Sequence, residues 1–146
     1  MTMTITGISE AVQEILEGVT SPEFVNVYPN PESKDTVFDG YPSATHFYQR
    51  TENGYATVTQ NRRVIEYSVF VYLLLVGTTE TERWLNGMSM VDKIVQVFDE
   101  SVDLNGACEI MRPTIGEMGK VNTTAGEGLL VEITLYCEAD TTFRNV

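Results

Sequence analysis

Residues 62–76, RRVIEYSVFVYLLLV, constrain the fold more than any other stretch, because they form the longest run that favours β-structure. Alternate residues of a strand face opposite sides of a sheet. One side is wholly apolar: Ile65, Tyr67, Val69, Val71, Leu73 and Leu75. The other side turns apolar only after Ser68, so we expect a central strand whose far end is covered on both faces, by helices or by another subunit. At roughly 3.3 Å per residue it would span about 50 Å, which predicts strong twist or a bulge near its start.

The N-terminal part of the chain has helical periodicity. Between residues 7 and 19, apolar side chains recur every three or four positions with glutamates between them, which predicts an amphipathic helix. Thr6 or Ser9 is expected to cap its start. A short strand at a sheet edge is predicted at 24–28, because prolines flank it, and a flexible loop is predicted at 29–42.

A second helix is predicted at residues 79–103. Thr79 and Glu82 have the spacing of a capping box, and an apolar stripe begins at Trp84. Gly87 weakens the middle of this stretch, so a kink or break is expected near it.

The residues before the central strand predict a hairpin. Strands are expected at 44–50 and 55–59, with a turn at 51–54 that contains Asn and Gly. Together with the central strand, these segments form an antiparallel meander.

The C-terminal third predicts two more strands around a loop. Residues 107–115 are expected to form a strand that Pro113 confines to an edge or a bulge. The glycine-rich residues 116–128 are expected to form a long, flexible loop. The last strand, 129–138, should pair beside the central strand, and the tail 139–146 should be frayed.

These elements predict an α+β fold: a twisted antiparallel or mixed sheet with two main helices packed on it. The length of 146 residues is typical of one domain, so we expect a single domain over residues 1–146. The sequence shows no signal-peptide pattern and no apolar run long enough to span a bilayer as a helix, which predicts a soluble, unsecreted chain.

The chain is strongly acidic, with 21 Asp and Glu against 9 Lys and Arg and a net charge of −12. Such a charge opposes adhesion to nucleic acid or anionic lipid by simple attraction. The two cysteines, Cys108 and Cys137, lack the spacing of a zinc site or a disulfide framework. We expect buried free thiols, with a disulfide or a reactive role as the alternative.

The residues offer little support for catalysis or for a cofactor. The single histidine, His46, has no second histidine or carboxylate cluster at ligand spacing, so a structural role is expected. The glycine-rich stretch lacks the lysine and the helix start of a phosphate-binding loop. Asp99, Glu100 and Asp103 lie at the end of the second helix, where a solvated helix end is the simplest explanation.

Positive charge is concentrated in one group, Arg50, Arg62 and Arg63. Arginine suits ion pairs at interfaces, so these residues could meet an acidic face of a neighbouring subunit. The candidate subunit contacts are therefore Arg50, Arg62 and Arg63, together with Phe70 and Tyr72 on the second side of the central strand.

The order of the elements from residue 40 to residue 140 resembles that of the tail terminator proteins of long-tailed bacteriophages, which are also called tail completion or neck proteins. Four stretches carry the resemblance, in this order: GYPSATHFYQ, NRRVIEYSVFVYLLLV, TETERWLNGMSMVDKIVQVF and GEGLLVEITLYCEA. The resemblance covers about two-thirds of the chain and rests on pattern and length more than on any invariant motif.

The resemblance implies a structural virion protein of the tail or neck, assembled in the host cytoplasm, with no enzymatic activity and no cofactor. Such subunits form a ring, commonly a hexamer, that caps the tail tube protein and joins it to the head-side connector or stopper protein. DNA would pass through the ring without specific binding. Six copies at −12 each would carry −72, a charge that repels DNA. No membrane is involved in this role.

Other functions remain open at this stage. The chain could be another component of the neck or the head-tail connector. It could also be a monomeric domain that binds a small ligand in a pocket between the second helix and the sheet, near Trp84 and Tyr72. A third possibility is an enzyme that holds a divalent ion on Asp99, Glu100 and Asp103.

Overall fold

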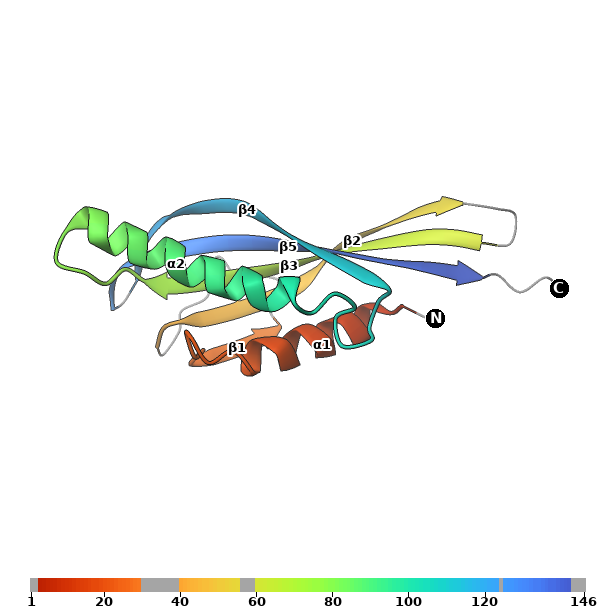
Figure 1. Cartoon of the computed structure of the whole chain (residues 1–146), viewed down its shortest axis with the longest axis horizontal. Coiled ribbons are helices and arrows are strands. Elements are labelled where there is room, and N and C mark those ends of the chain that lie inside the picture. Colours follow the sequence, from red (N-terminus) through yellow and green to blue (C-terminus); the bar gives the residue numbers. More distant parts are fainter. Residues whose placement is uncertain (1–2, 30–39, 56–59, 124, 143–146) are drawn as a thin grey trace.

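The computed structural model describes residues 3–29, 40–55, 60–123 and 125–142. Its elements are α1 (Ile5–Glu17), β1 (Asn26–Pro29), β2 (Ser43–Tyr55), β3 (Gln60–Leu74), α2 (Glu80–Asp99), β4 (Ile110–Thr123) and β5 (Gly126–Thr142). The strands form one sheet in the order β1-β2-β3-β5-β4; β1 and β2 are parallel and all other pairs are antiparallel. Both helices pack on one face of this sheet (Figure 1). The predicted α+β fold with a mixed sheet and two main helices is confirmed.

The central position predicted for residues 62–76 is also confirmed, because β3 lies between β2 and β5. Its pairing with β5 runs without a register shift along the whole strand. The bulge that we expected near the start of this strand lies instead in β2, where the register shifts between Tyr48 and Arg50. The extra residue therefore bends β2 and leaves the pairing between β3 and β5 intact.

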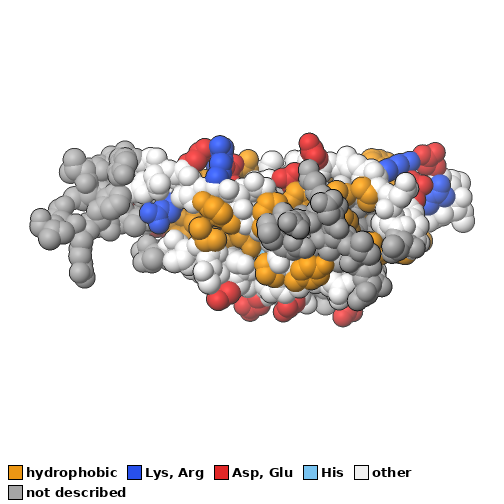
Figure 2. All heavy atoms as spheres, turned by 180° about the vertical axis from the view of Figure 1, so that it is seen from behind, with side chains coloured by type: hydrophobic (Ala, Val, Ile, Leu, Met, Phe, Trp, Pro, Cys, Tyr) orange, Lys and Arg blue, Asp and Glu red, His pale blue; other side chains and the backbone are white. Residues whose placement is uncertain are grey.

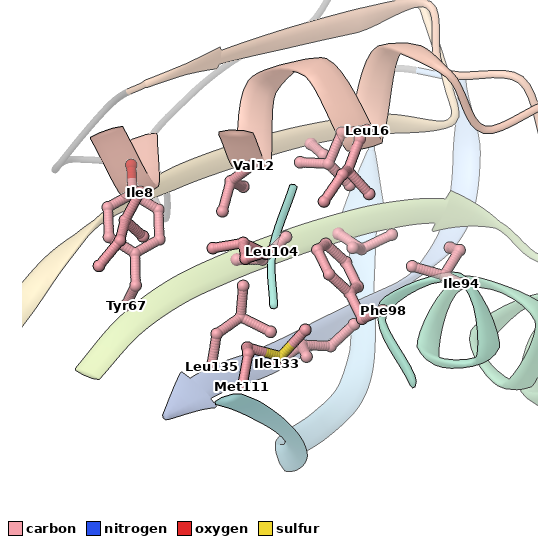
Figure 3. Close-up of a cluster of buried hydrophobic side chains, with 14 of the residues drawn as sticks. Ile8, Val12, Leu16, Tyr67, Ile94, Phe98, Leu104, Met111, Ile133 and Leu135 are labelled. Carbon is pink, nitrogen blue, oxygen red and sulfur yellow. The ribbon is translucent and has the colours of Figure 1, made fainter. Parts of the chain in front are cut away.

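The core lies between the two helices and the helix-facing side of the sheet. The alternate apolar residues predicted for the central strand all contribute to it, and each is at most 8% exposed. Figure 3 shows side chains from both helices, from the segment after α2 and from the strands meeting in this layer: Ile8, Val12, Leu16, Tyr67, Ile94, Phe98, Leu104, Met111, Ile133 and Leu135.

Helix α1 begins two residues earlier than the predicted range 7–19. Thr4 is the N-cap, and its Oγ1 accepts a hydrogen bond from the Gly7 backbone N–H at 3.0 Å. The prediction that Thr6 or Ser9 caps this helix is wrong, because both residues already lie within its first turns. The amphipathic pattern itself is confirmed, with the buried side chains facing the sheet.

Helix α2 begins as predicted. Thr79 is the N-cap, and its Oγ1 accepts from the Glu82 backbone N–H at 3.1 Å. The Glu82 carboxylate in turn accepts from the backbone N–H and the hydroxyl of Thr78, one residue before the position expected in a capping box. The helix ends at Asp99, so the predicted end at residue 103 is wrong.

A kink or a break was predicted near Gly87, and the break is wrong, because α2 is continuous through this residue. Gly87 is buried against the sheet, where a Cβ atom would lie 2.7 Å from Leu75 Cδ2 and 3.3 Å from Leu129 Cδ2. The glycine therefore lets the helix backbone approach the sheet closely.

Replacing Thr79 with alanine is expected to lower the free energy of unfolding by about 1 kcal/mol, because the Glu82 N–H loses its side-chain acceptor. Thr81→Ala is the matched control, since Thr81 is exposed in the first turn of the same helix and should change stability by less than about 0.5 kcal/mol. Urea unfolding followed by circular dichroism measures both variants. Equal effects of the two substitutions would contradict the assigned cap.

The predicted hairpin of 44–50 and 55–59 is wrong. Residues 51–54, which were expected to turn, continue β2 in antiparallel pairing with β3. The long partner strand satisfies their backbone groups and so overrides the local turn preference of Asn and Gly. Residues 56–59 lie outside the described residues.

The predicted flexible loop at 116–128 is also wrong. The strand expected at 107–115 begins at Ile110 and continues to Thr123, and the strand expected at 129–138 begins at Gly126. Within this stretch, residues 118–123 pair with residues 126–131, after a register shift between Ile115 and Met118. The edge position that Pro113 predicted is confirmed, because β4 is the outer strand.

The two remaining irregular segments are described in part. Pro29 belongs to β1, Gly40 to Pro42 form a bend, and residues 30–39 of the predicted loop at 29–42 lie outside the described residues. The predicted frayed tail at 139–146 is wrong for residues 139–142, which are part of β5. The predicted edge strand at 24–28 is confirmed as β1, shifted toward the C-terminus.

Candidate interaction surface

The sheet face opposite the helices is the candidate interaction surface. No helix of the described residues lies on this face, which we call the open face (Figures 1 and 2). Figure 2 shows hydrophobic side chains gathered near its centre. The sheet also has a second apolar cluster, separate from the core: Phe70 and Tyr72, with Tyr28, Tyr41, Phe47 and Leu130 packed against them.

Two of the predicted contact residues, Phe70 and Tyr72, lie in this second cluster. Their side chains are only 4% and 5% exposed, and Phe70 stacks on Phe47 with ring centroids 5.5 Å apart. The surface that a partner can touch is therefore supplied by the partly buried side chains around them, such as Phe47 and Leu130.

The open face is hollowed beside this cluster. A hollow of about 430 Å³ is lined by apolar and charged side chains and by one glycine: Phe70, Glu117, Met118, Gly119, Lys120, Val121, Leu130 and Glu132. A smaller polar groove of about 210 Å³ includes Ser68, whose fully buried Oγ has no hydrogen-bond partner. This face therefore changes from apolar to polar along the sheet.

Arg50 and Arg62 are paired within the chain. Arg50 makes ion pairs with Glu66 and Glu52. Arg62 Nη1 lies 3.2 Å from Glu109 Oε2 and 3.1 Å from Asp140 Oδ1. The structure therefore gives these two arginines intramolecular partners, and only a rearrangement would release them for a neighbouring subunit.

Arg63 lies on a part of the sheet that projects past both helices. Residues 52–55, 60–63 and 139–142 form this three-stranded end, which we call the arm (Figure 1). Arg63 donates from Nε to Asn53 Oδ1 at 3.2 Å, and no described carboxylate lies within ion-pair distance of it. Of the three predicted arginines, Arg63 is thus the most available to a partner.

The exposed side of α1 carries the opposite charge. Glu10, Glu14 and Glu17 are exposed at intervals of three or four residues, so they share one side of the helix. The first 33 residues of the chain contain no Lys or Arg. Figure 2 shows acidic side chains along the edge of the molecule where α1 lies. This surface can complement a basic group such as Arg63.

A buried polar network joins α1 to the sheet at His46, which is fully buried. His46 Nε2 lies 2.7 Å from Gln13 Oε1, and Nδ1 lies 2.6 Å from the Tyr67 hydroxyl, which is 3.0 Å from Ser9 Oγ. Gln13 Nε2 donates to the Val27 carbonyl, so Gln13 Oε1 is the acceptor. The Nε2 atom of His46 therefore carries a proton, which it donates to Gln13 Oε1, while the Tyr67 hydroxyl donates to Ser9 Oγ.

Burial lowers the pKa of His46 from 6.5 to about 4, because the charged form loses its hydration. A neutral histidine at physiological pH, with its proton on Nε2, makes the hydrogen bond to Gln13. The arrangement holds the helix to the sheet and matches the structural role expected for His46.

The two alternative sites are not assembled in the structure. Trp84 packs on the helix side of the sheet and Tyr72 in the cluster of the open face, so the prediction that they line one pocket is wrong. A hollow of about 460 Å³ beside Trp84 is lined instead by Glu80, Thr81, Leu85 and Lys120. Within the described ranges no three or more His, Cys, Asp or Glu side chains, including Asp99, Glu100 and Asp103, are grouped as metal ligands would be. No helix in the described part of the chain is long and apolar enough to cross a bilayer.

Sequence reasoning missed the links between distant segments. The partners of His46 on α1 and β3 lie 33 and 21 residues away in the chain, and neither spacing carries a recognisable signal. The acidic face of α1 was visible in the sequence as glutamates at helical spacing.

A comparison with models of known protein families finds no match, and no curated protein matches the chain.

Proposed function

We propose that the chain is a structural subunit of a phage tail, a tail terminator that assembles into a ring between the tail tube and the head-side connector. The observation that carries the proposal is the one-sided sheet. The two helices cover one face of the sheet. The other face has an apolar cluster, a hollow beside it and a polar region. Surfaces of this kind suit association through shape. The order of the elements resembles that of tail terminators, and on this resemblance we propose that the association takes place at the end of a phage tail.

The charge distribution supports a head-to-tail contact between copies. Arg63 lies on the arm at one end of the sheet, whereas the glutamates of α1 lie on the helix layer. A contact between two different surfaces is heterologous and generates a closed ring when the rotation between copies closes. The net charge of −12 per copy would keep DNA from adhering to such a ring.

Arg63→Glu is expected to raise the concentration at the midpoint of self-assembly, or of attachment to tails, by about tenfold, because an attractive charge pair becomes repulsive. Lys93→Glu is the matched control: it changes the net charge equally but lies on the exposed side of α2. The double variant that carries both Arg63→Glu and Glu14→Arg should assemble again, because the swapped charges attract each other. Sizing by light scattering measures all three variants.

Negative-stain imaging of the chain, with and without purified tails that lack a terminator, tests the function itself. Rings at the tail end are the expected result. A chain that stays monomeric and also fails to join tails would overturn the proposed function. Rings that form normally with Arg63→Glu would instead leave the function standing and remove Arg63 from the contact.

A further inference from the structure

The outer strand β4 has a free edge along its second half. Its first half is obstructed, because the Met111 N–H donates to the Val102 carbonyl at 2.7 Å and Pro113 has no N–H to offer. After the register shift that follows Ile115, residues 118–123 pair with β5 on one side, and no described strand pairs with them on the other. These six residues, which we call the free edge, are a template for a further strand.

Two hollows flank the free edge, one on each face of the sheet. On the open face, the hollow of about 430 Å³ lies over Phe70 and Leu130. On the helix side, the hollow of about 460 Å³ lies beside Trp84 and the exposed Leu85. Lys120 lines both hollows, so they meet β4 at the same point of the chain.

Gly119 leaves the hollow of the open face accessible from the free edge. It lines this hollow, and a Cβ atom at its position would meet nothing within 4 Å. A side chain from a strand beside β4 can therefore extend over Gly119 toward Leu130. Successive side chains of a strand point to opposite faces, so the next one would point toward Trp84 on the helix side. An extended segment can thus fill both hollows at once, whereas a helix lying on one face can fill only one.

The charge around the two hollows is acidic. Glu117 and Glu132 line the hollow of the open face, and neither makes an ion pair with a described residue. On the helix side, Lys120 Nζ lies 2.5 Å from Glu80 Oε1 and 3.3 Å from Glu127 Oε1, so one ammonium group serves two carboxylates. Four carboxylates therefore surround a single positive charge, and they favour a segment that carries Lys or Arg.

We propose that the free edge of β4 binds an extended, basic segment of another protein as an additional strand of the sheet. Main-chain hydrogen bonds to residues 118–123 supply affinity, and apolar side chains in the two hollows supply specificity. The chain itself has only 9 Lys and Arg against 21 Asp and Glu, which favours a different protein over a second copy as the source. The inference rests on the proposed use of the open face as a contact surface, and it gives the chemistry of the segment that this face accepts.

A synthetic heptapeptide with blocked ends, Lys-Thr-Leu-Phe-Leu-Thr-Lys, tests the proposal. When extended, it has apolar side chains on both faces and a lysine at each end. Trp84 is the only tryptophan of the chain, so its fluorescence reports occupation of the hollow on the helix side, and calorimetry gives the dissociation constant. Saturable binding with a dissociation constant below about 1 mM is the expected result. A peptide that shows no saturable binding would overturn the proposal.

Two N-methylated forms of the peptide test whether it binds as a strand. One form is methylated at its odd positions and the other at its even positions, so each lacks alternate backbone donors. A strand that is paired along one edge directs only every second N–H to its partner. One form should therefore bind at least about tenfold more weakly, while the other stays within about threefold of the parent peptide. Equal affinities of the two forms would contradict the added strand.

Gly119→Phe fills the hollow of the open face and should weaken binding of the peptide by at least about tenfold. Thr114→Phe is the matched control, because Thr114 is exposed on the same strand and lines neither hollow; its effect should be less than about twofold. Equal effects of the two substitutions would contradict the site. Self-association of the wild-type chain that Gly119→Phe abolishes would assign the free edge to a second copy and overturn the proposal.

The outcomes of this test and of the test of the proposed function are separate. A chain that forms rings on tails but binds no peptide would leave the proposed function standing and overturn only the added strand. A chain that binds the peptide with the expected pattern but never joins tails would support the added strand and overturn the proposed function.

Discussion

Replacing Phe98 with alanine is expected to lower the free energy of unfolding by about 3 to 5 kcal/mol. Phe98 is fully buried and lies where α2 meets the strands and the segment after the helix, close to Leu104 and Met111 (Figure 3). Removal of its ring leaves a cavity between layers that the sheet cannot close, because β3 and β5 are paired along their whole length.

Chemical denaturation followed by circular dichroism measures this loss. Leu85→Ala is the matched control, because Leu85 is on the same helix but 56% exposed, and it should cost less than about 0.5 kcal/mol. Should Phe98→Ala prevent folding, Phe98→Leu keeps most of the volume and should cost less than about 1.5 kcal/mol. A loss below about 1 kcal/mol for the alanine variant would contradict the packing of α2.

Acidification is expected to weaken the protein through His46. The pKa of His46 is about 4 in the folded protein and 6.5 when the side chain is free, so the unfolded chain binds the proton first. The stabilisation is complete above the unfolded value and is lost as the pH falls from about 6.5 through 4. Between pH 7.5 and 4.5 the loss should be about 2 to 3 kcal/mol.

His46→Asn separates this loss from the titration of carboxylates. Glu10, Glu14 and Glu17 line the surface around His46 and are present in both proteins, so their contributions cancel in the difference. Unfolding free energies measured across this pH range should fall less steeply in the variant. Parallel curves for the two proteins would show that His46 can be protonated in the folded state without cost.

The elements that a regular pattern specifies were predictable. Residues 62–76 alternate so strongly that their strand and its central position follow from the sequence, and Thr79 with Glu82 locates the start of α2. Each signal is local, and the tertiary structure agrees with it. The intramolecular ion pairs of Arg50 with Glu66 and of Arg62 with Asp140 were not predictable, since these partners lie on other strands.

The errors occurred where pairing with a distant strand decides the structure. Asn53 and Gly54 favour a turn locally, but β3 provides hydrogen-bond partners along their whole strand. Gly128 was also predicted to lie in a loop. A Cβ atom at this position would lie 2.9 Å from the Leu73 carbonyl oxygen, so the glycine instead allows two strands to pack closely. The network at His46 also depends on contacts that one sequence does not reveal.

The position of β5 determines when the protein can fold during its synthesis. β5 is the last of the described strands to be synthesised, yet it lies between β3 and β4 and supplies a partner to both. Until residues 126–142 have emerged, the apolar central strand has one unpaired edge, and α2 lacks part of the sheet surface on which it packs. The nascent chain must therefore remain without its complete sheet, and open to chaperones or to aggregation, until residues 126–142 have been made.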